Sequence, residues 1–377
     1  MLRTSERNLF KRCQWAWERN YIDRLENANR FSSALWFGTG IHLALEKWYI
    51  PGAERGVHPV ETWKAYCDEA RADTTYINTY LDGDFSEAVT ALELGTAMLD
   101  NYVKEYGLEP HLEVISAEQT FNVGIRYDEA KMDGDIARFD PAVGDYVGTF
   151  DLVARDTRDG KVYLWDHKTA AQLGSSATQY LPLDDQAGAY MAVANHTLHE
   201  QGLLGPDERI SGIVYNYLVK RKPDLRPRNA DGYCTNKPQK KHYIAALEGD
   251  GLAKMKLDDL QRLAEEQGIT VLGEVSSQQP SPLLERKVVH RSAWQNRSQI
   301  KRIGEDMKHM SLVRNNLLAA TKTPTRECGF CQFRDICELD EQGKDWHEYA
   351  DMVYRHWEPY GSHVTPDNNP QTSEGES

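Results

Sequence analysis

The sequence contains no long hydrophobic run: nowhere in its 377 residues do roughly 18 consecutive apolar side chains occur, the length that a membrane-spanning helix needs. Its first residues, MLRTSERNLFKRCQWAW, also lack the apolar core and the small-residue cleavage site of a secretory signal. These absences predict a protein of the cytoplasm, with no membrane among its partners.

A phosphate-binding loop and an excess of basic residues are absent too. No G-x-x-x-x-G-K-[ST] segment occurs, which excludes a P-loop helicase motor within this sequence. The 44 Lys and Arg against 58 Asp and Glu give a formal net charge of −14, which argues against a protein that coats nucleic acid over its whole surface. Two tracts, 219–242 and 286–302, are nevertheless basic, so contact with nucleic acid is expected at selected places only.

Apolar patterning predicts one α/β domain over residues 1–357, followed by a polar and disordered tail over 358–377. In the first predicted helix, Thr4 or Ser5 is the expected N-terminal cap. Strands are predicted at 112–123, 146–155, 161–165 and 209–219, and helices at 4–26, 33–50, 59–107 with a break near Asp82–Asp84, 184–198, 251–267 and 291–320.

Residues 146–168 predict a β-hairpin that brings two carboxylates together. If the turn is Thr157–Gly160, the register places Asp151 directly opposite Asp166, with Cβ atoms about 4.5–5.5 Å apart. Lys168 lies two residues after Asp166 and therefore shares its face of the strand. Because buried like charges are costly, the pair needs either a proton or a cation.

A divalent metal would supply that cation, although an ion pair between the carboxylates and Lys168 alone remains open. His42, on the helix predicted at 33–50, completes a three-ligand set for Mg²⁺ or Mn²⁺ with Asp151 and Asp166, and its imidazole favours Mn²⁺. Taken alone, a histidine on a helix face is more often a packing residue. The main-chain carbonyl of His167 is a natural further ligand. Lys168 would then orient or deprotonate a water for hydrolysis of a phosphodiester.

Four short motifs carry a family resemblance: GTGIHLALE at 38–46, GTFD at 148–151, DHK at 166–168 and Gln186-x-x-x-Tyr190. In this order they resemble the PD-(D/E)xK nuclease superfamily, and more narrowly its RecB-like branch, over about residues 4–340. The resemblance implies a restriction-endonuclease-like mixed β-sheet flanked by helices. It also implies metal binding by the histidine and the two aspartates, with Lys168 catalytic. Gln186 and Tyr190 would approach the site and the DNA, although helix packing alone also explains them.

The six cysteines include Cys328-x2-Cys331-x5-Cys337 and, far upstream, Cys13. One distant and three close thiols suit a four-thiolate site, and this spacing favours a [4Fe–4S] cluster over zinc. A redox-active pair at Cys328 and Cys331 is the alternative. The pattern is similar to the iron–sulfur site of AddB-type and CRISPR-associated nucleases, which implies a cluster that ties the N-terminal and C-terminal parts together. The remaining cysteines, Cys67 and Cys234, are expected to be plain thiols.

The resemblance implies a stand-alone, metal-dependent DNA exonuclease acting on single strands or exposed ends, in prokaryotic or phage recombination or repair. A recombinase or a single-strand-binding protein is the expected protein partner. The alternatives are a non-catalytic DNA-binding scaffold and a sequence-specific or structure-specific endonuclease. The basic tracts offer candidate DNA contacts, or else solvated loops: Lys220, Arg221, Lys222, Arg226, Arg228, Trp294 and Arg297.

Overall fold

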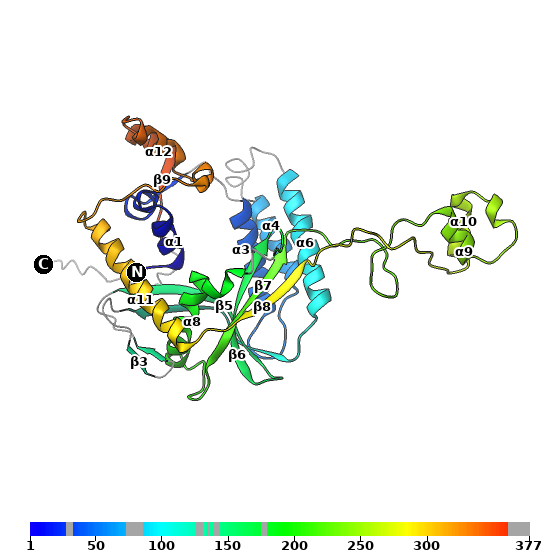
Figure 1. Ribbon diagram of the computed structural model, residues 1–377, viewed down its shortest axis with the longest axis horizontal. Helices are drawn as coiled ribbons and strands as arrows, with labels where there is room; N and C mark the ends of the chain where they lie inside the picture. Colours follow the sequence, from blue (N-terminus) through cyan, green and yellow to red (C-terminus); the bar gives the residue numbers. More distant parts are fainter. Residues whose placement is uncertain are drawn as a thin grey trace.

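The computed structural model describes residues 1–27, 33–72, 86–125, 131–133, 136–138, 144–174 and 179–360. Its centre is a five-stranded sheet in the order β2-β5-β6-β7-β8 (Figure 1). Strands β6 and β7 run parallel and the other neighbours are antiparallel. The strands are β2 Leu112–Gly124, β5 Asp145–Asp156, β6 Lys161–Ala170, β7 Ile210–Val219 and β8 Leu284–Val289. The predicted mixed α/β architecture is confirmed.

Helices cover both faces of this sheet, and each face has its own hydrophobic core. On one face lie α3 (Ser33–Trp48), α4 (Pro59–Ala72) and α6 (Ser86–Tyr106), and on the other lie α8 (Asp185–Glu200) and α11 (Ala293–Arg314) (Figure 1). Helix α8 is the crossover that two parallel strands require between β6 and β7. Its small and apolar residues are almost all buried, so it packs closely on the sheet.

The two ends of the described chain meet in a separate cluster. The N-terminal α1 (Thr4–Arg12) and α2 (Gln14–Trp17) lie beside the C-terminal α12 (Arg334–Glu341) and α13 (His347–Val353) (Figure 1). Strand β1 (Leu25–Asn27) pairs with β9 (Tyr354–His356). Buried Trp15, Phe333, Ile336 and Trp346 form the centre of this cluster. The other short elements are a π-helix at Glu18–Ile22, 3₁₀ turns at Leu181–Leu183, Leu252–Lys254 and Arg326–Phe330, and strands β3 Lys131–Asp133 and β4 Ile136–Arg138.

The single helix predicted over 4–26 is wrong. Cys13 takes an extended conformation, with φ −163° and ψ 111°, and separates α1 from α2. After this break, the two tryptophans of α2 point to opposite sides: Trp15 enters the terminal cluster and Trp17 enters the core that α8 shares with the sheet. The predicted cap is wrong as well, because Arg3 is the N-terminal cap and its side chain makes no capping hydrogen bond.

The predicted hairpin is confirmed. Strands β5 and β6 pair from Asp156 with Lys161 to Leu152 with Trp165, which is the predicted register. Gly160 has φ +70° in the turn, a conformation that glycine adopts without steric cost. The other predicted strands and the helices at 33–50, 184–198, 251–267 and 291–320 are present with shifted ends.

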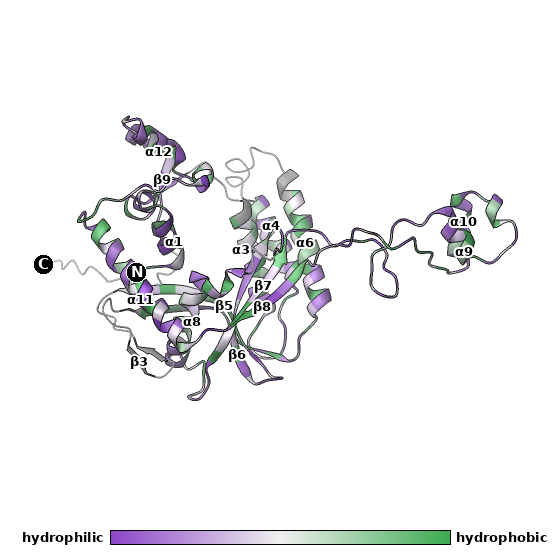
Figure 2. Ribbon diagram, viewed as in Figure 1, coloured by the Kyte–Doolittle hydropathy of each residue, from purple (hydrophilic) through white to green (hydrophobic). Residues whose placement is uncertain are grey.

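An insertion between β7 and β8 extends far from the body of the protein (Figure 1). It carries α9 (Lys240–Ala246) and α10 (Leu257–Glu266), which share a small core of their own around Tyr243 and Leu260. Figure 2 shows hydrophobic residues in this lobe, apart from those of the central sheet. The predicted break near Asp82–Asp84 lies outside the described residues, as does the predicted tail (358–377) from residue 361 onward. Within the described part of the chain, no helix combines the length and the apolarity needed to cross a membrane.

Two glycines of α3 provide a matched test of the packing between α3 and α4. A Cβ atom at Gly40 would lie 2.5 Å from Trp63 and 2.6 Å from Tyr66, whereas at Gly38 the nearest atom is 3.8 Å away. We expect Gly40→Ala to lower the free energy of unfolding by about 1–3 kcal/mol through overpacking. Gly38→Ala should instead leave it unchanged or raise it by up to about 1 kcal/mol through helix propensity. Urea unfolding of both variants measures the difference, and equal stability would contradict this packing.

Candidate active site

The candidate site lies where β5 and β6 separate. Their ladder ends at Leu152 and Trp165. Beyond it, β5 pairs with β2 and bridges to Leu2, while β6 pairs with β7. Asp151 and Asp166 are the first residues past the last pair, one on each strand. The main-chain N–H of His167, which the ladder no longer uses, donates to Asp151 Oδ2 at 2.7 Å. This separation of β5 and β6, called the fork below, therefore fixes one carboxylate by a hydrogen bond.

Three side chains from different elements converge on this fork. His42 of α3, Glu118 of β2 and Asp151 of β5 each offer one ligand atom, and these atoms lie within 4.8 Å of one another. His42 Nδ1 is 3.4 Å from Asp151 Oδ2. His42 and Asp151 were predicted from the sequence, but Glu118 was not. Glu118 falls between the pairs Ala117–Leu152 and Gln119–Phe150 of the β2–β5 ladder, at the position facing Asp151.

Glu118 lies in an environment that disfavours its charged form, and its backbone conformation is unusual. Burial, together with the nearby carboxylates of Asp151 and Glu46, raises the pKa of Glu118 to about 8. Its backbone has φ +47°, in the left-handed region that non-glycine residues seldom adopt. A bulge earlier in β2, between Val114 and Ser116, sets which side chains face the fork. A glutamate on a strand gives little signal in a sequence, because the bulge that directs it is not visible there.

Asp166 and Lys168 form an ion pair at the same fork. Lys168 Nζ is 2.9 Å from Asp166 Oδ2, and the aspartate side chain is only 3% exposed. Burial, opposed by Lys168 but reinforced by Asp151, raises the pKa of Asp166 to about 7. Burial lowers the pKa of Lys168, but Asp166 and Asp151 outweigh burial and raise it, so the amine stays protonated. Among the described residues, no donor makes a hydrogen bond of good geometry to the buried Asp166 Oδ2.

The remaining predicted residues adjoin this pair. Lys168 Nζ donates to Gln186 Oε1 at 3.1 Å, and Gln186 Nε2 donates to the Tyr190 hydroxyl at 3.2 Å. Both residues lie on α8, one helical turn apart, as their spacing predicted. The His167 side chain is buried, and burial together with the charges of His42, Arg286 and Lys168 holds its pKa well below the ordinary value. Its imidazole is therefore neutral, while a role for its carbonyl stays a prediction.

The donor set fits a divalent metal ion. Three carboxylates and one imidazole surround the fork, which is a suitable set for Mg²⁺ or Mn²⁺, and the imidazole favours Mn²⁺. The raised pKa values of Glu118 and Asp166 describe a site that is short of positive charge even with the Lys168 ammonium beside it. His42, Glu118 and Asp151 would hold an ion together. Asp166, the predicted third ligand, is not in this group, but it lies close enough to Asp151 for their charges to interact.

The four cysteines expected in one site do line one cavity. It has a volume of about 390 Å³ and lies between α1, α2 and the segment from Thr323 to Glu338. Burial, and the proximity of Cys13 and Cys331, raise the pKa of the Cys337 thiol, whereas Lys322 acts in the opposite direction. The extended conformation of Cys13 brings its side chain to this cavity. The four lining cysteines are Cys13, Cys328, Cys331 and Cys337, while Cys67 and Cys234 are buried elsewhere.

The candidate DNA contacts are only partly available for phosphates. Lys222 pairs with Glu93 at 2.7 Å, and Arg226 pairs with Asp224 at 2.6 Å. The Lys220 ammonium lies over the Phe37 ring, and Arg228 donates to the Gly232 carbonyl. Arg221 is exposed, and Arg297 lies beside the exposed ring of Trp294. DNA contact by these residues stays a prediction.

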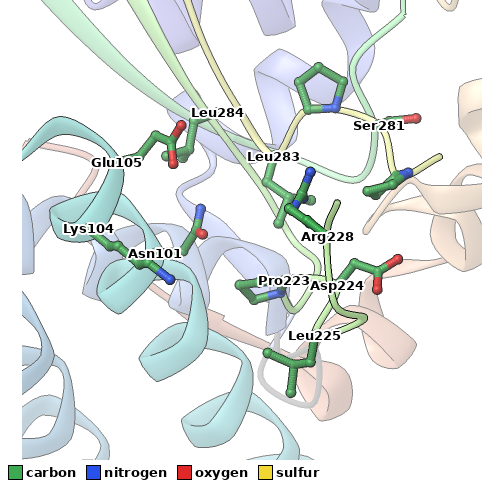
Figure 3. Close-up of a pocket in the computed structure, with 12 residues that line it drawn as sticks. Asn101, Lys104, Glu105, Pro223, Asp224, Leu225, Arg228, Ser281, Leu283 and Leu284 are labelled. Atoms are coloured by element: carbon green, nitrogen blue, oxygen red, sulfur yellow. The ribbon is translucent and has the colours of Figure 1, made fainter. Parts of the chain in front are cut away.

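A second cavity, of about 570 Å³, lies between the base of the insertion and α6 (Figure 3). Figure 3 shows Lys104 and Glu105 of α6 on one side of it and Asp224, Leu225 and Arg228 of the insertion on the other. It shares no residue with the fork or with the cysteine cavity. The candidate active site is therefore recognised by its carboxylates and not by the size of a cavity.

The fold and the fork define a carboxylate–lysine centre built on a mixed sheet. The family model of the PD-(D/E)XK nuclease superfamily matches residues 4–338, which include the fork, α8 and all four clustered cysteines. The chain belongs to this superfamily, and the predicted resemblance is confirmed at that level. No curated protein matches the chain. The narrower RecB-like assignment stays a prediction.

The raised pKa values predict how the stability of the metal-free protein depends on pH. Above its unfolded pKa of 4.5 and below about 8, the folded protein keeps a proton on Glu118 that the unfolded chain has released. The free energy of unfolding should therefore fall as pH rises through this window, and Asp166 acts in the same direction up to about pH 7. Saturating Mn²⁺ should reduce the fall, because the ion replaces the protons.

Urea unfolding with a chelator, at several pH values across this window, measures the slope. Glu118→Gln should flatten it, whereas Glu113→Gln, on the same strand but paired with Arg155, should not. If Glu118→Gln keeps the slope of the unmodified protein, the environment assigned to Glu118 is wrong.

Proposed function

We propose that this protein is a metal-dependent DNA exonuclease of the RecB-like branch. The observation that carries the proposal is the fork: an Asp166–Lys168 ion pair lies beside His42, Glu118 and Asp151, which converge from three elements. Membership of the nuclease superfamily supports hydrolysis of a phosphodiester as the reaction.

The residues of the fork and its surroundings would have separate roles in that reaction. A bound Mg²⁺ or Mn²⁺ would act as a Lewis acid toward the phosphate and would lower the pKa of water. Lys168 keeps its proton beside Asp166 and can stabilise charge that develops on the phosphate. Gln186 holds the Lys168 ammonium by a hydrogen bond, and Tyr190 in turn holds Gln186. The His167 amide fixes Asp151 in its orientation.

A preference for single-stranded or end-exposed DNA is supported by exposed aromatic side chains. Trp294 is 72% exposed beside Arg297, and Tyr180, which is close enough to Lys168 and Asp166 to feel their charges, is 52% exposed. Rings in such positions can stack on unpaired bases. The proposed setting is DNA recombination or repair in a prokaryote or its phage, with a recombinase or a single-strand-binding protein as partner.

We also propose that Cys13, Cys328, Cys331 and Cys337 hold a [4Fe–4S] cluster. Their common cavity of about 390 Å³ supports this. One distant and three closely spaced cysteines in the sequence favour this cluster over zinc. The cluster would join α1 to the C-terminal segment.

The second candidate is a non-catalytic DNA-binding scaffold. Such a protein would not need a carboxylate in surroundings that disfavour its charged form. An aspartate whose pKa is raised to about 7, beside a half-buried protonated lysine, is typical of a catalytic site and is not needed for binding alone. In the complete set, Lys168 is bonded to both Asp166 and Gln186, and the His167 amide is bonded to Asp151, which favours the enzyme.

Substitution at the ion pair tests the enzyme directly. We expect Lys168→Ala and Asp166→Asn to lower Mn²⁺-dependent cleavage by about 10²–10⁴-fold while the protein stays folded. Lys161→Ala, at the exposed far end of the same strand, is the matched control and should cleave normally. The substrates are end-labelled single-stranded and duplex DNA, each linear and circular. Unimpaired cleavage by Lys168→Ala would refute the assignment, and cleavage of circular DNA would refute an exonuclease.

The cluster makes its own prediction. Protein purified without oxygen should be brown and contain about four irons per chain. Alanine at Cys13, Cys328, Cys331 or Cys337 should remove the iron and lower thermal stability, whereas alanine at Cys67 or Cys234 should keep the iron. Iron and zinc analysis of each variant decides the question. Stoichiometric zinc without iron in the unmodified protein would contradict the cluster.

A further inference from the structure

A row of three polar residues crosses the sheet directly behind the candidate active site. His167 of β6 pairs in register with Asn216 of β7, and Asn216 pairs in register with Arg286 of β8. Asn216 lies 2.9 Å from His167 Nδ1 and accepts a hydrogen bond from Arg286 Nε at 3.2 Å. Because His167 and Asn216 are almost fully buried, water cannot substitute for these bonds.

The chemistry of Arg286 fixes the direction of each hydrogen bond in this row. An arginine Nε can only donate, so the atom of Asn216 that faces it must be the oxygen. The Asn216 amide nitrogen therefore faces His167 and the Tyr102 hydroxyl, which is 3.0 Å away. An amide nitrogen can only donate, so His167 Nδ1 must accept. The imidazole is consequently held with its proton on Nε2.

Arg286 is in turn fixed by groups from the helical layer. Its guanidinium forms an ion pair with Glu109, whose side chain is only 4% exposed, and also donates to Tyr102 at 3.0 Å. Tyr49 donates to Glu109 at 2.9 Å, so its oxygen accepts the proton of Tyr102 at 2.6 Å. The donors of Arg286, Asn216, Tyr102 and Tyr49 thus each have an acceptor within this network. Such a fully bonded buried network has one arrangement and resists change.

The row matters because it anchors the main chain that carries the site. Beyond the fork, β6 has a strand neighbour on one side only, which is β7. The His167 ring is held on the helical side by Asn216 and stacks parallel to the Tyr49 ring, with centroids 6.0 Å apart. The amide of the same residue donates to Asp151, and its two neighbours are Asp166 and Lys168. Movement of the ring would therefore disturb three residues of the site together.

We propose that Asn216, fixed by Arg286, is a positioning residue of the active site, which acts through the His167 ring to hold Asp151, Asp166 and Lys168 in their metal-binding and catalytic arrangement. This inference rests on the proposed function, since it assigns Asn216 a role in the same metal site. None of the motifs recognised in the sequence includes Asn216, Arg286 or Glu109.

Asn216→Asp tests the proposal because it changes the direction of one hydrogen bond with little change in shape. The new carboxylate still accepts from Arg286 but can no longer donate to His167, so Nδ1 must become the donor. We expect nitrogen-15 NMR of labelled histidines to show the His167 proton on Nε2 in the unmodified protein and on Nδ1 in the variant. Loss of the signals in His167→Phe identifies them. A proton on Nδ1 in the unmodified protein would overturn the proposal, and this measurement requires no folded Asn216 variant.

Metal affinity supplies the second readout. We expect Asn216→Asp to bind Mn²⁺ about 10- to 100-fold more weakly in a titration followed by electron paramagnetic resonance, as substitutions behind metal ligands do. Asn195→Asp is the matched control, because this buried asparagine lies on α8 and accepts from Ile210 at the opposite end of β7. It should bind Mn²⁺ normally.

The positioning role of Asn216 and the proposed nuclease function can fail separately. If the unmodified protein binds Mn²⁺ and cleaves DNA while Asn216→Asp binds Mn²⁺ equally well, the positioning role is refuted and the nuclease stands. If the unmodified protein neither binds Mn²⁺ nor cleaves DNA, the proposed function is refuted, and the positioning role with it.

Discussion

Repulsion between carboxylates that the fold forces together is the constraint on which the rest of this structure depends. Asp151, Asp166 and Glu118 meet where two strands separate, in surroundings that raise the pKa of two of them toward neutrality. Such a concentration of like charge is unfavourable unless protons or cations balance it. Lys168 supplies one positive charge. The remaining need for positive charge is what connects the fold to metal binding and to the chemistry of its superfamily.

The architecture supplies the rigidity that holds these groups in place. Helix α8 returns the chain from β6 to β7 and also carries Gln186 and Tyr190 to the lysine. On the opposite side of the sheet, the buried network around Arg286 holds the strand that carries Asp166 and Lys168. The site therefore lies between two independent cores, each of which fixes one face of the same strand.

Much of this arrangement could be predicted from the sequence, because it depends on local pattern. The alternation of strand residues and a four-residue turn fix the hairpin register, and with it the approach of Asp151 to Asp166. Long-range features could not be predicted. Glu118 faces the fork because of a bulge in β2, and the extended Cys13 interrupts the predicted helix at a place that no proline or glycine marks in the sequence. The lobe around α9 and α10 has too small a core to stand out as a unit in the sequence.

The most direct test of this account is the anomalous scattering of manganese in crystals grown at neutral pH and soaked in Mn²⁺. The account predicts a peak at the fork between β5 and β6, bounded by His42, Glu118 and Asp151, with Asp166 adjacent to it. A map with no peak at the fork, in crystals where the same side chains point away from one another, would contradict it.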